Sequence, residues 1–148
     1  MTQREYPERP IVGVGAVIIH HGRVLLIKRG RPPLMGEWSL PGGVVEVGET
    51  LRAAAEREAL EETGLVVKAG EVLEVLDRII RDRGVAAGRV QYHYVLIDFL
   101  CAVQSGEVSA GGDAAAAQWA REDELEKFKL EKMALMVIRK GFSASSPK

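Results

Sequence analysis

Apolar residues gather along the chain in continuous runs that are typical of buried β-strands. Ile11–His20, which reads "IVGVGAVIIH", is almost entirely apolar and rich in β-branched residues. Such a run predicts a strand that is covered on both faces of a sheet. Similar but shorter or more mixed runs predict strands at 24–28, 38–40, 66–80 and 90–103, and a short segment around Trp119.

The polar and helix-forming positions predict one central helix and a second helical region near the end of the chain. Residues 50–63 are rich in alanine and are followed by Gly64, a common helix stop. Helical patterns return at 121–127 and 130–140, with a partial apolar face in the second of them. Residues 29–37, 81–89 and 104–117 are predicted to be loops, and residues 1–10 and 142–148 to be loose termini.

Strands that precede and follow a central helix, with another helix closing the chain, predict an α/β structure around a mixed sheet. No repeat or linker divides the 148 residues, so a single domain spanning 1–148 is expected. The net charge of −1 gives no general attraction to nucleic acid or to a membrane. The lone Cys101 and the lack of a long apolar stretch indicate a core cysteine in a cytoplasmic protein.

The central helix carries an unusual group of acids. Placed at 100° per residue, Glu58, Glu61 and Glu62 fall within a sector of about 120° that also holds Leu51, Ala54 and Ala55. The carboxylates therefore continue an apolar stripe, whereas a solvated charged face would lie opposite it. Like charges at this spacing repel, and a bound cation would relieve the repulsion. Oxygen ligands of this kind suit Mg²⁺.

The segment that contains these acids resembles the Nudix box, G-x5-E-x7-R-E-U-x-E-E-x-G-U, in which U is an apolar residue. Every spacing is kept, from Gly43 through Glu49, Arg57, Glu58, Ala59, Glu61, Glu62 and Gly64 to Leu65. Ala59 is smaller than the usual aliphatic residue, a departure that affects packing alone. The flanking "GEWSLPGG" is also similar to Nudix hydrolases.

The resemblance implies an α/β/α sandwich and a hydrolase that uses Mg²⁺ or Mn²⁺ on nucleoside diphosphate derivatives. Carried over by position, Glu58, Glu61 and Glu62 are the expected metal ligands, together with the backbone carbonyl of Gly42. Arg57 and Glu49 are expected to form a supporting ion pair. Glu58 is also a candidate for the base that takes a proton from the attacking water.

Three residues outside the box are weaker candidates. Asp113 lies in the loop "SAGGDAAAAQW", which in relatives often supplies a further acid to the metal or the water. The glutamate that relatives tend to carry a few residues later is replaced by alanines, which leaves Asp113 as the only acid of this loop. Whether the base is Glu58 or a loop acid stays open. Arg29 and Arg31 precede the box in a loop that could face a phosphate, although ordinary surface charge is an alternative.

The resemblance leaves the substrate open. The pattern around the box looks most like ADP-ribose pyrophosphatases, which implies ADP-ribose or a similar nucleotide sugar. A MutT-type nucleoside triphosphate pyrophosphatase is the main alternative, and dinucleoside polyphosphates or capped RNA are others. A non-catalytic domain that senses a nucleotide is an alternative of another class. The expected partner is a small nucleotide, with no stable nucleic-acid or membrane partner, and a homodimer is common among relatives.

Overall fold

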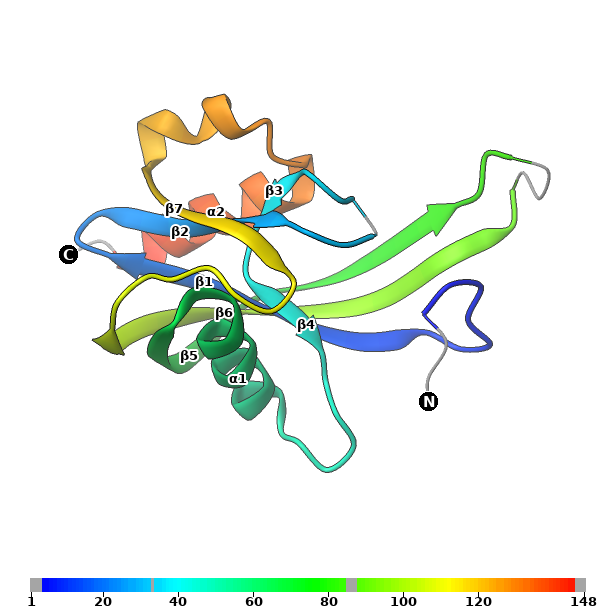
Figure 1. Cartoon of the computed structure of the whole chain (residues 1–148), viewed down its shortest axis with the longest axis horizontal. Coiled ribbons are helices and arrows are strands. Elements are labelled where there is room, and N and C mark those ends of the chain that lie inside the picture. Colours follow the sequence, from blue (N-terminus) through cyan, green and yellow to red (C-terminus); the bar gives the residue numbers. More distant parts are fainter. Residues whose placement is uncertain (1–3, 33, 85–87, 146–148) are drawn as a thin grey trace.

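The computed structural model describes residues 4–32, 34–84 and 88–145 and shows a mixed β-sheet with helices packed on it (Figure 1). The strands are β1 (Ile11–His20), β2 (Arg23–Arg29), β3 (Trp38–Ser39), β4 (Gly42–Val44), β5 (Leu65–Arg81), β6 (Val90–Gly106) and β7 (Ala114–Arg121). The helices are α1 (Leu51–Thr63), the 3₁₀ helix η1 (Glu122–Phe128) and α2 (Lys132–Ser145). The strand order is β3-β2-β1-β6-β5, with β4 added to β1 and β7 added to β2.

Strand β1 holds the sheet together, because it pairs with three other strands. It runs parallel to β6 from Ile11 to Ile18. Its first half pairs antiparallel with β4, and its end pairs antiparallel with β2. Most residues of β1 are buried, which confirms the predicted burial on both faces. β4 and β2 pair with different parts of β1.

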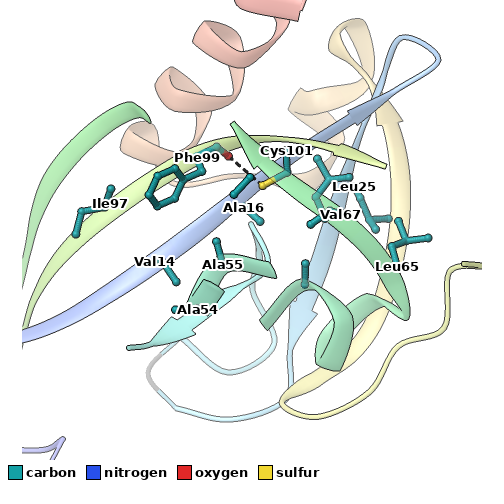
Figure 2. Close-up of a cluster of buried hydrophobic side chains, with 13 residues drawn as sticks. Val14, Ala16, Leu25, Ala54, Ala55, Leu65, Val67, Ile97, Phe99 and Cys101 are labelled. Carbon is teal, nitrogen blue, oxygen red and sulfur yellow. Dashed lines mark hydrogen bonds between the residues drawn. The ribbon is translucent and has the colours of Figure 1, made fainter. Parts of the chain in front are cut away.

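Alternate residues of β1 face two separate cores. Val14, Ala16 and Ile18 pack with Ala54 and Ala55 of α1 on one face of the sheet (Figure 2). Val17 packs with residues of α2 in the other buried cluster. The two helices therefore cover opposite faces, which confirms the predicted α/β/α sandwich.

Cys101 lies in the core on the α1 face, beside Phe99 (Figure 2). It is buried and unpaired, and burial raises the pKa of its thiol to about 12. A thiol that stays protonated is a poor nucleophile. The prediction of a structural core cysteine is confirmed.

Helix α1 has the boundaries that the sequence predicts, because its end signals are local. The Thr50 side chain accepts a hydrogen bond from the Ala53 amide at 3.1 Å. Gly64 ends the helix with φ of 78°, a left-handed conformation that glycine adopts without steric cost. None of the helices described here is long and apolar enough to cross a membrane.

Several predicted boundaries are wrong. Gly42–Val44 forms β4, where the sequence predicts no strand, and β7 begins at Ala114, inside the predicted loop. Residues 122–128 form a helix close to the predicted span 121–127, and it is of the 3₁₀ type. In each case pairing or packing with a distant segment decides the conformation.

The two termini are also more ordered than predicted, as far as the structure describes them. Tyr6 hydrogen-bonds through its amide to the Gln91 carbonyl at 2.7 Å and through its hydroxyl to Asp82. These contacts fix the N-terminal segment to the long β5–β6 hairpin, which extends beyond the helices (Figure 1). Helix α2 continues to Ser145, and Gly141 and Phe142 are buried. Residues 1–3 and 146–148 lie outside the described residues.

Gly141 tests whether this end of the chain is a packed helix. A Cβ at Gly141 would lie 2.6 Å from Val17 Cγ1 and 3.1 Å from Ile19 Cδ1. We expect Gly141→Val to lower the free energy of unfolding by about 1–3 kcal/mol, the usual cost of overpacking a core. Ser143→Val, at an exposed position of the same helix, is the matched control for helix propensity. Equal and small effects of both variants in urea unfolding would favour a loose C-terminal segment, such as the sequence predicts for residues 142–148.

Candidate active site

A pocket opens where β1, β4 and β6 lie side by side near the C-terminal end of α1. Its floor includes Gly13 and Gly15 of β1, which present no side chains. Gly42 and Gly43 of β4 form one side of the pocket, next to Glu62. The other lining residues include Arg4, Arg29, Leu76, Arg78, Tyr94, Leu96, Asp98 and Asp113.

Glu62 is the acid most deeply placed in this site. It is 2% exposed, and its Oε1 accepts a hydrogen bond from the Gly42 amide at 2.7 Å. Burial raises the pKa of its carboxyl to about 7, against the lowering effect of that hydrogen bond. The negative charges of Glu58 and Asp113 raise the pKa further, whereas Arg29 lowers it. A carboxylate held in this way favours a proton or a bound cation.

The glycine pair of β4 makes room for the acids of α1. A Cβ at Gly43 would lie 2.5–2.7 Å from the carboxyl atoms of Glu58, and a Cβ at Gly42 would overlap the Val14 carbonyl. Any side chain at Gly43 would therefore push Glu58 away from the strand. The pair brings the helix and β4 close enough for Glu58 and Glu62 to reach the strand backbone.

Arg57 connects the helix to the segment before it. Its Nε and Nη2 donate to the two carboxylate oxygens of Glu49 at 2.6 and 3.0 Å, and Nη2 also donates to the Val44 carbonyl at 3.1 Å. Its Nη1 donates to Glu58 at 2.8 Å and to Glu61 at 3.3 Å. The hydrogen bond from Arg57 holds the pKa of Glu49 below its ordinary value. The Arg57–Glu49 ion pair is present as predicted, with the bidentate geometry that only arginine can provide.

The acids predicted to share one sector of α1 have different environments. Glu62 lies in the buried stripe with Ala54 and Ala55, as predicted. Glu58 is largely buried, and burial raises the pKa of its carboxyl more than Arg57 lowers it. Glu61 is at the edge, with 51% of its side chain exposed. Leu51, which was placed in the same stripe, is also exposed.

The candidates outside the helix separate into two groups. Arg29 and Asp113 line the pocket, near Glu62. Arg31 lies on the exposed loop, where its Nε pairs with Asp113 Oδ1 at 3.1 Å. The structure therefore brings Gly42, Glu62, Asp113 and Arg29 together, and it links Arg31 to the site only through Asp113.

Asp98 lines the same pocket and was missed in the sequence. It lies in β6, within the apolar run "YVLIDFLC", and is 6% exposed. Burial raises the pKa of its carboxyl to about 6. The available signal was a single acid in an otherwise apolar strand, since buried acids are rare unless they serve a purpose.

Comparison with known proteins gives the same assignment as the local geometry. The chain matches the NUDIX domain over residues 9–139. The chain belongs to the NUDIX domain family. The Nudix box thus forms β4, helix α1 and the segment between them, and of its acids Glu62 lines the pocket.

Two relatives and one solved structure illustrate the similarity. The chain is 41% identical over 111 residues to an ADP-ribose pyrophosphatase of Methanocaldococcus jannaschii, covering 74% of this chain and 61% of the relative's length. It is 30% identical over 132 residues to a MutT-like protein of Streptomyces ambofaciens, covering 89% of this chain and 77% of that protein. A MutT NUDIX hydrolase from Burkholderia pseudomallei superposes with a TM-score of 0.73 at 34% identity, covering 90% of this chain and 98% of that one.

The donor atoms of the Nudix site fit a divalent cation such as Mg²⁺. Within the described residues, no three His, Cys, Asp or Glu side chains converge to enclose an ion by themselves. The reason is visible at Arg57, whose Nη1 engages Glu58 and Glu61. Mg²⁺ does not need an all-protein cage, because it usually keeps waters and takes substrate phosphates as ligands. The buried Glu62 carboxylate, with its raised pKa, is the group that such a cation would stabilise most.

The ionised Glu62 carboxylate should therefore lower the free energy of unfolding of the metal-free protein at high pH. Its carboxyl has a pKa of about 7 in the fold against an ordinary 4.5, so the native state holds the proton more tightly than the unfolded chain. The contribution of this group to stability is present below pH 4.5 and is lost as pH rises to about 7. In EDTA at pH 8, we expect Glu62→Gln to be more stable than the wild type by on the order of 1–3 kcal/mol.

Urea unfolding at pH 5 and pH 8 measures this difference. Glutamine keeps an oxygen for the Gly42 amide, so the variant removes mainly the charge. At pH 5 the two proteins should differ little. A wild type that is equally or more stable than Glu62→Gln at pH 8 would show that the carboxylate is not strained by burial.

Proposed function

We propose that this protein hydrolyses the diphosphate bond of a nucleoside diphosphate sugar of the ADP-ribose type, with Mg²⁺ or Mn²⁺ as its cofactor. The observation that carries the proposal is the buried Glu62 carboxylate on Gly42, at the edge of a pocket that also holds Arg29 and Arg78. Acids for a cation and arginines for phosphate oxygens therefore share one site. The name of the M. jannaschii relative, ADP-ribose pyrophosphatase, supports this substrate class. Because the chain spans 61% of that relative, the substrate is our proposal.

The proposed cation ligands are Glu58, Glu61 and Glu62 of α1 and the carbonyl of Gly42, with Asp113 as a further acid from the loop. A bound divalent ion would neutralise diphosphate charge and lower the pKa of water. Arg29 lines the pocket beside Glu62 and is proposed to contact a phosphate oxygen. Arg31 would act only by holding Asp113 in place.

Glu58 is proposed to be the general base. Its carboxylate accepts the proton of the water that attacks one phosphorus, and the bond from that phosphorus to the bridging oxygen breaks. ADP-ribose and water would give AMP and ribose 5-phosphate. Burial raises the pKa of Glu58 toward the range in which a base works well, while Arg57 holds its carboxylate in position. Glu49 acts through Arg57 as a positioning residue.

A second candidate function has a specific observation in its favour. Over 71 residues the chain is 46% identical to a putative 8-oxo-dGTP diphosphatase 2 of Mycobacterium tuberculosis, covering 47% of this chain and 45% of that protein. A MutT-type enzyme would release a nucleoside monophosphate and diphosphate from a triphosphate. A Nudix domain that binds a nucleotide without cleaving it remains the alternative of another class.

The remaining predictions from the sequence belong to the same proposal. The protein acts on a small nucleotide, as a single domain over 1–148, in the cytoplasm, without a stable nucleic-acid or membrane partner. A homodimer is the proposed assembly. Size-exclusion chromatography with light scattering would measure the assembly directly.

A nucleotide panel tests the substrate and the need for metal together. We expect ADP-ribose with Mg²⁺ to give AMP and ribose 5-phosphate, and EDTA to abolish turnover. A folded Glu62→Gln variant, which lacks the charge of one proposed cation ligand, should also lose most of the rate. A much larger kcat/KM for dGTP or 8-oxo-dGTP would select the MutT-type function. Nucleotide binding without any turnover would select the sensor.

A comparison of two acids tests the identity of the base. Glu58 lies on a rigid helix, whereas Asp113 lies on a loop and pairs with Arg31. Removing a general base typically costs 10²–10⁴-fold in rate. At saturating Mg²⁺ we expect that loss in kcat for Glu58→Gln and a loss of roughly tenfold or less for Asp113→Asn. A larger loss for Asp113→Asn would assign the base or an essential ligand to the loop.

A further inference from the structure

Asp98 occupies a place in the pocket that the proposed chemistry does not use. In the sheet it is paired with Gly15 of β1, and Gly15 is paired in turn with Gly42 of β4. The three residues form one row across three strands, with Glu62 bonded to Gly42 at the end of the row. Asp98 therefore lies two strands away from β4, the strand to which Glu62 is hydrogen-bonded.

The carboxyl of Asp98 is buried, and its contacts within the described part of the chain leave its oxygens without a donor. Among the residues that the structure describes, no hydrogen bond or ion pair to Asp98 is found, although the residue is only 6% exposed. Among the described residues, every fully buried side-chain oxygen or nitrogen has a hydrogen-bond partner. Because the oxygens of Asp98 have no such partner, they are not fully buried and must face the pocket. A carboxylate in such a place is costly to retain unless a ligand donates hydrogen bonds to it.

Gly15 shapes the approach to this carboxyl. A Cβ at Gly15 would overlap Asp98 Oδ1, so the oxygen rests against the backbone of β1. The adjacent floor is formed by Gly13 and Gly42, which also lack side chains. A ligand lying over this row of glycines can therefore contact Asp98 without meeting a side chain in between.

The position along the sheet indicates which part of a nucleotide would lie there. Neighbouring strands are about 4.8 Å apart, so the row from Gly42 to Asp98 spans roughly 10 Å. A phosphate held beside Glu62 and Arg29 places the attached ribose, and not the distant base, over Gly15 and Asp98. Tyr94 is four residues from Asp98 along β6, about 13 Å away, and with Leu76 and Leu96 it gives an apolar surface for a base.

We propose that Asp98 binds the vicinal 2′- and 3′-hydroxyls of the nucleoside ribose and so selects ribonucleotides over deoxyribonucleotides. A carboxylate has two acceptor oxygens, which match two adjacent hydroxyl donors, and acids recognise ribose in this way in dinucleotide-binding folds. The inference rests on the proposed function, since it takes the phosphates to lie beside Glu62. It gives a physical reason why an ADP-ribose-type substrate would be preferred to a dNTP.

The charge of Asp98 is compatible with this role near neutral pH. Burial raises the pKa of its carboxyl to about 6, Arg78 lowers it and Glu74 raises it. Arg78 also pairs with Glu131, and Glu74 with Lys140. At pH 7.5 the carboxyl is therefore mostly ionised and accepts hydrogen bonds.

Binding of AMP, which contains no diphosphate bond to cleave, separates this inference from the proposed activity. Calorimetry with Mg²⁺ at pH 7.5 would compare AMP with 2′,3′-dideoxy-AMP. Hydrogen bonds to a charged group contribute about 1.5–3 kcal/mol, so we expect the wild type to bind AMP about 10- to 100-fold more tightly. In Asp98→Ala this preference should fall to about threefold or less, with binding of the dideoxy compound little changed.

Asp98→Asn keeps the shape of the side chain and should show an intermediate preference if the alanine variant folds poorly. Glu74→Gln is the matched control, because it removes a partly exposed acid near Asp98 and should leave the preference unchanged. Thermal unfolding would show that each variant is folded. If the protein cleaves no nucleotide but shows this pattern of binding, the proposed hydrolase function is wrong and the proposed ribose contact still holds.

Four results would overturn the inference. The first two are equal binding of the two nucleotides by the wild type, and no binding of AMP at millimolar concentration. The third is an Asp98→Ala variant that binds both nucleotides more weakly by the same factor, which would indicate a role in pocket shape. IMP lacks the exocyclic amine of adenine, so loss of an AMP-over-IMP preference in Asp98→Ala, with the dideoxy preference intact, would assign Asp98 to the base.

Discussion

The acids of α1 reach the pocket because β4 carries glycines at the positions where the helix approaches it. Gly42 and Gly43 let the helix approach β4 until Glu62 accepts the Gly42 amide and Glu58 lies against Gly43. Gly13 and Gly15 continue this bare surface onto β1. Without this close approach, the carboxylates would lie farther from the strand and would remain solvated. Their ordinary pKa values would then return, and the cation that we propose would gain less from binding there.

Arg57 compensates part of the acidic charge but cannot compensate all of it. Its guanidinium contacts Glu49, Glu58 and Glu61, and it also binds a carbonyl of the neighbouring segment. Glu62 lies beyond this network and depends on the Gly42 amide and the nearby Arg29. The arrangement is stable enough to fold, yet it leaves the most buried carboxylate in need of a further positive charge. Glu62 thus links the stability of the fold to the cation that we propose it binds.

The parts of the fold that the sequence predicts correctly are those with local determinants. Thr50 and Gly64 mark the ends of α1, and the apolar run of β1 indicates burial on both faces. The pairing of Arg57 with Glu49 is predicted from the resemblance to the Nudix box, in which the two residues lie close together in the chain. All of these signals lie within a few turns of helix or one strand.

The features that the sequence did not predict depend on residues far apart in the chain. β4 is a strand because it pairs with β1, although two of its three residues are glycines, which disfavour a strand. Gly141 and Phe142 belong to a helix because they pack on the sheet, despite the glycine and serine around them. Asp98 becomes notable only when the register places Gly15 opposite it, and that register is set by the parallel pairing of β1 and β6.

That register also restricts how this pocket can change in evolution. Positions 15 and 98 share one small volume, since a methyl group on Gly15 would overlap the carboxyl of Asp98. A substitution at either position therefore depends on the residue at the other. A side chain can be accommodated at position 15 only after the side chain at position 98 has become smaller or has adopted another rotamer. A homologue that carries alanine or serine at the first position should carry a different residue at the second. Paired changes at these two sites would record where one lineage of this fold altered the ligand that it accepts.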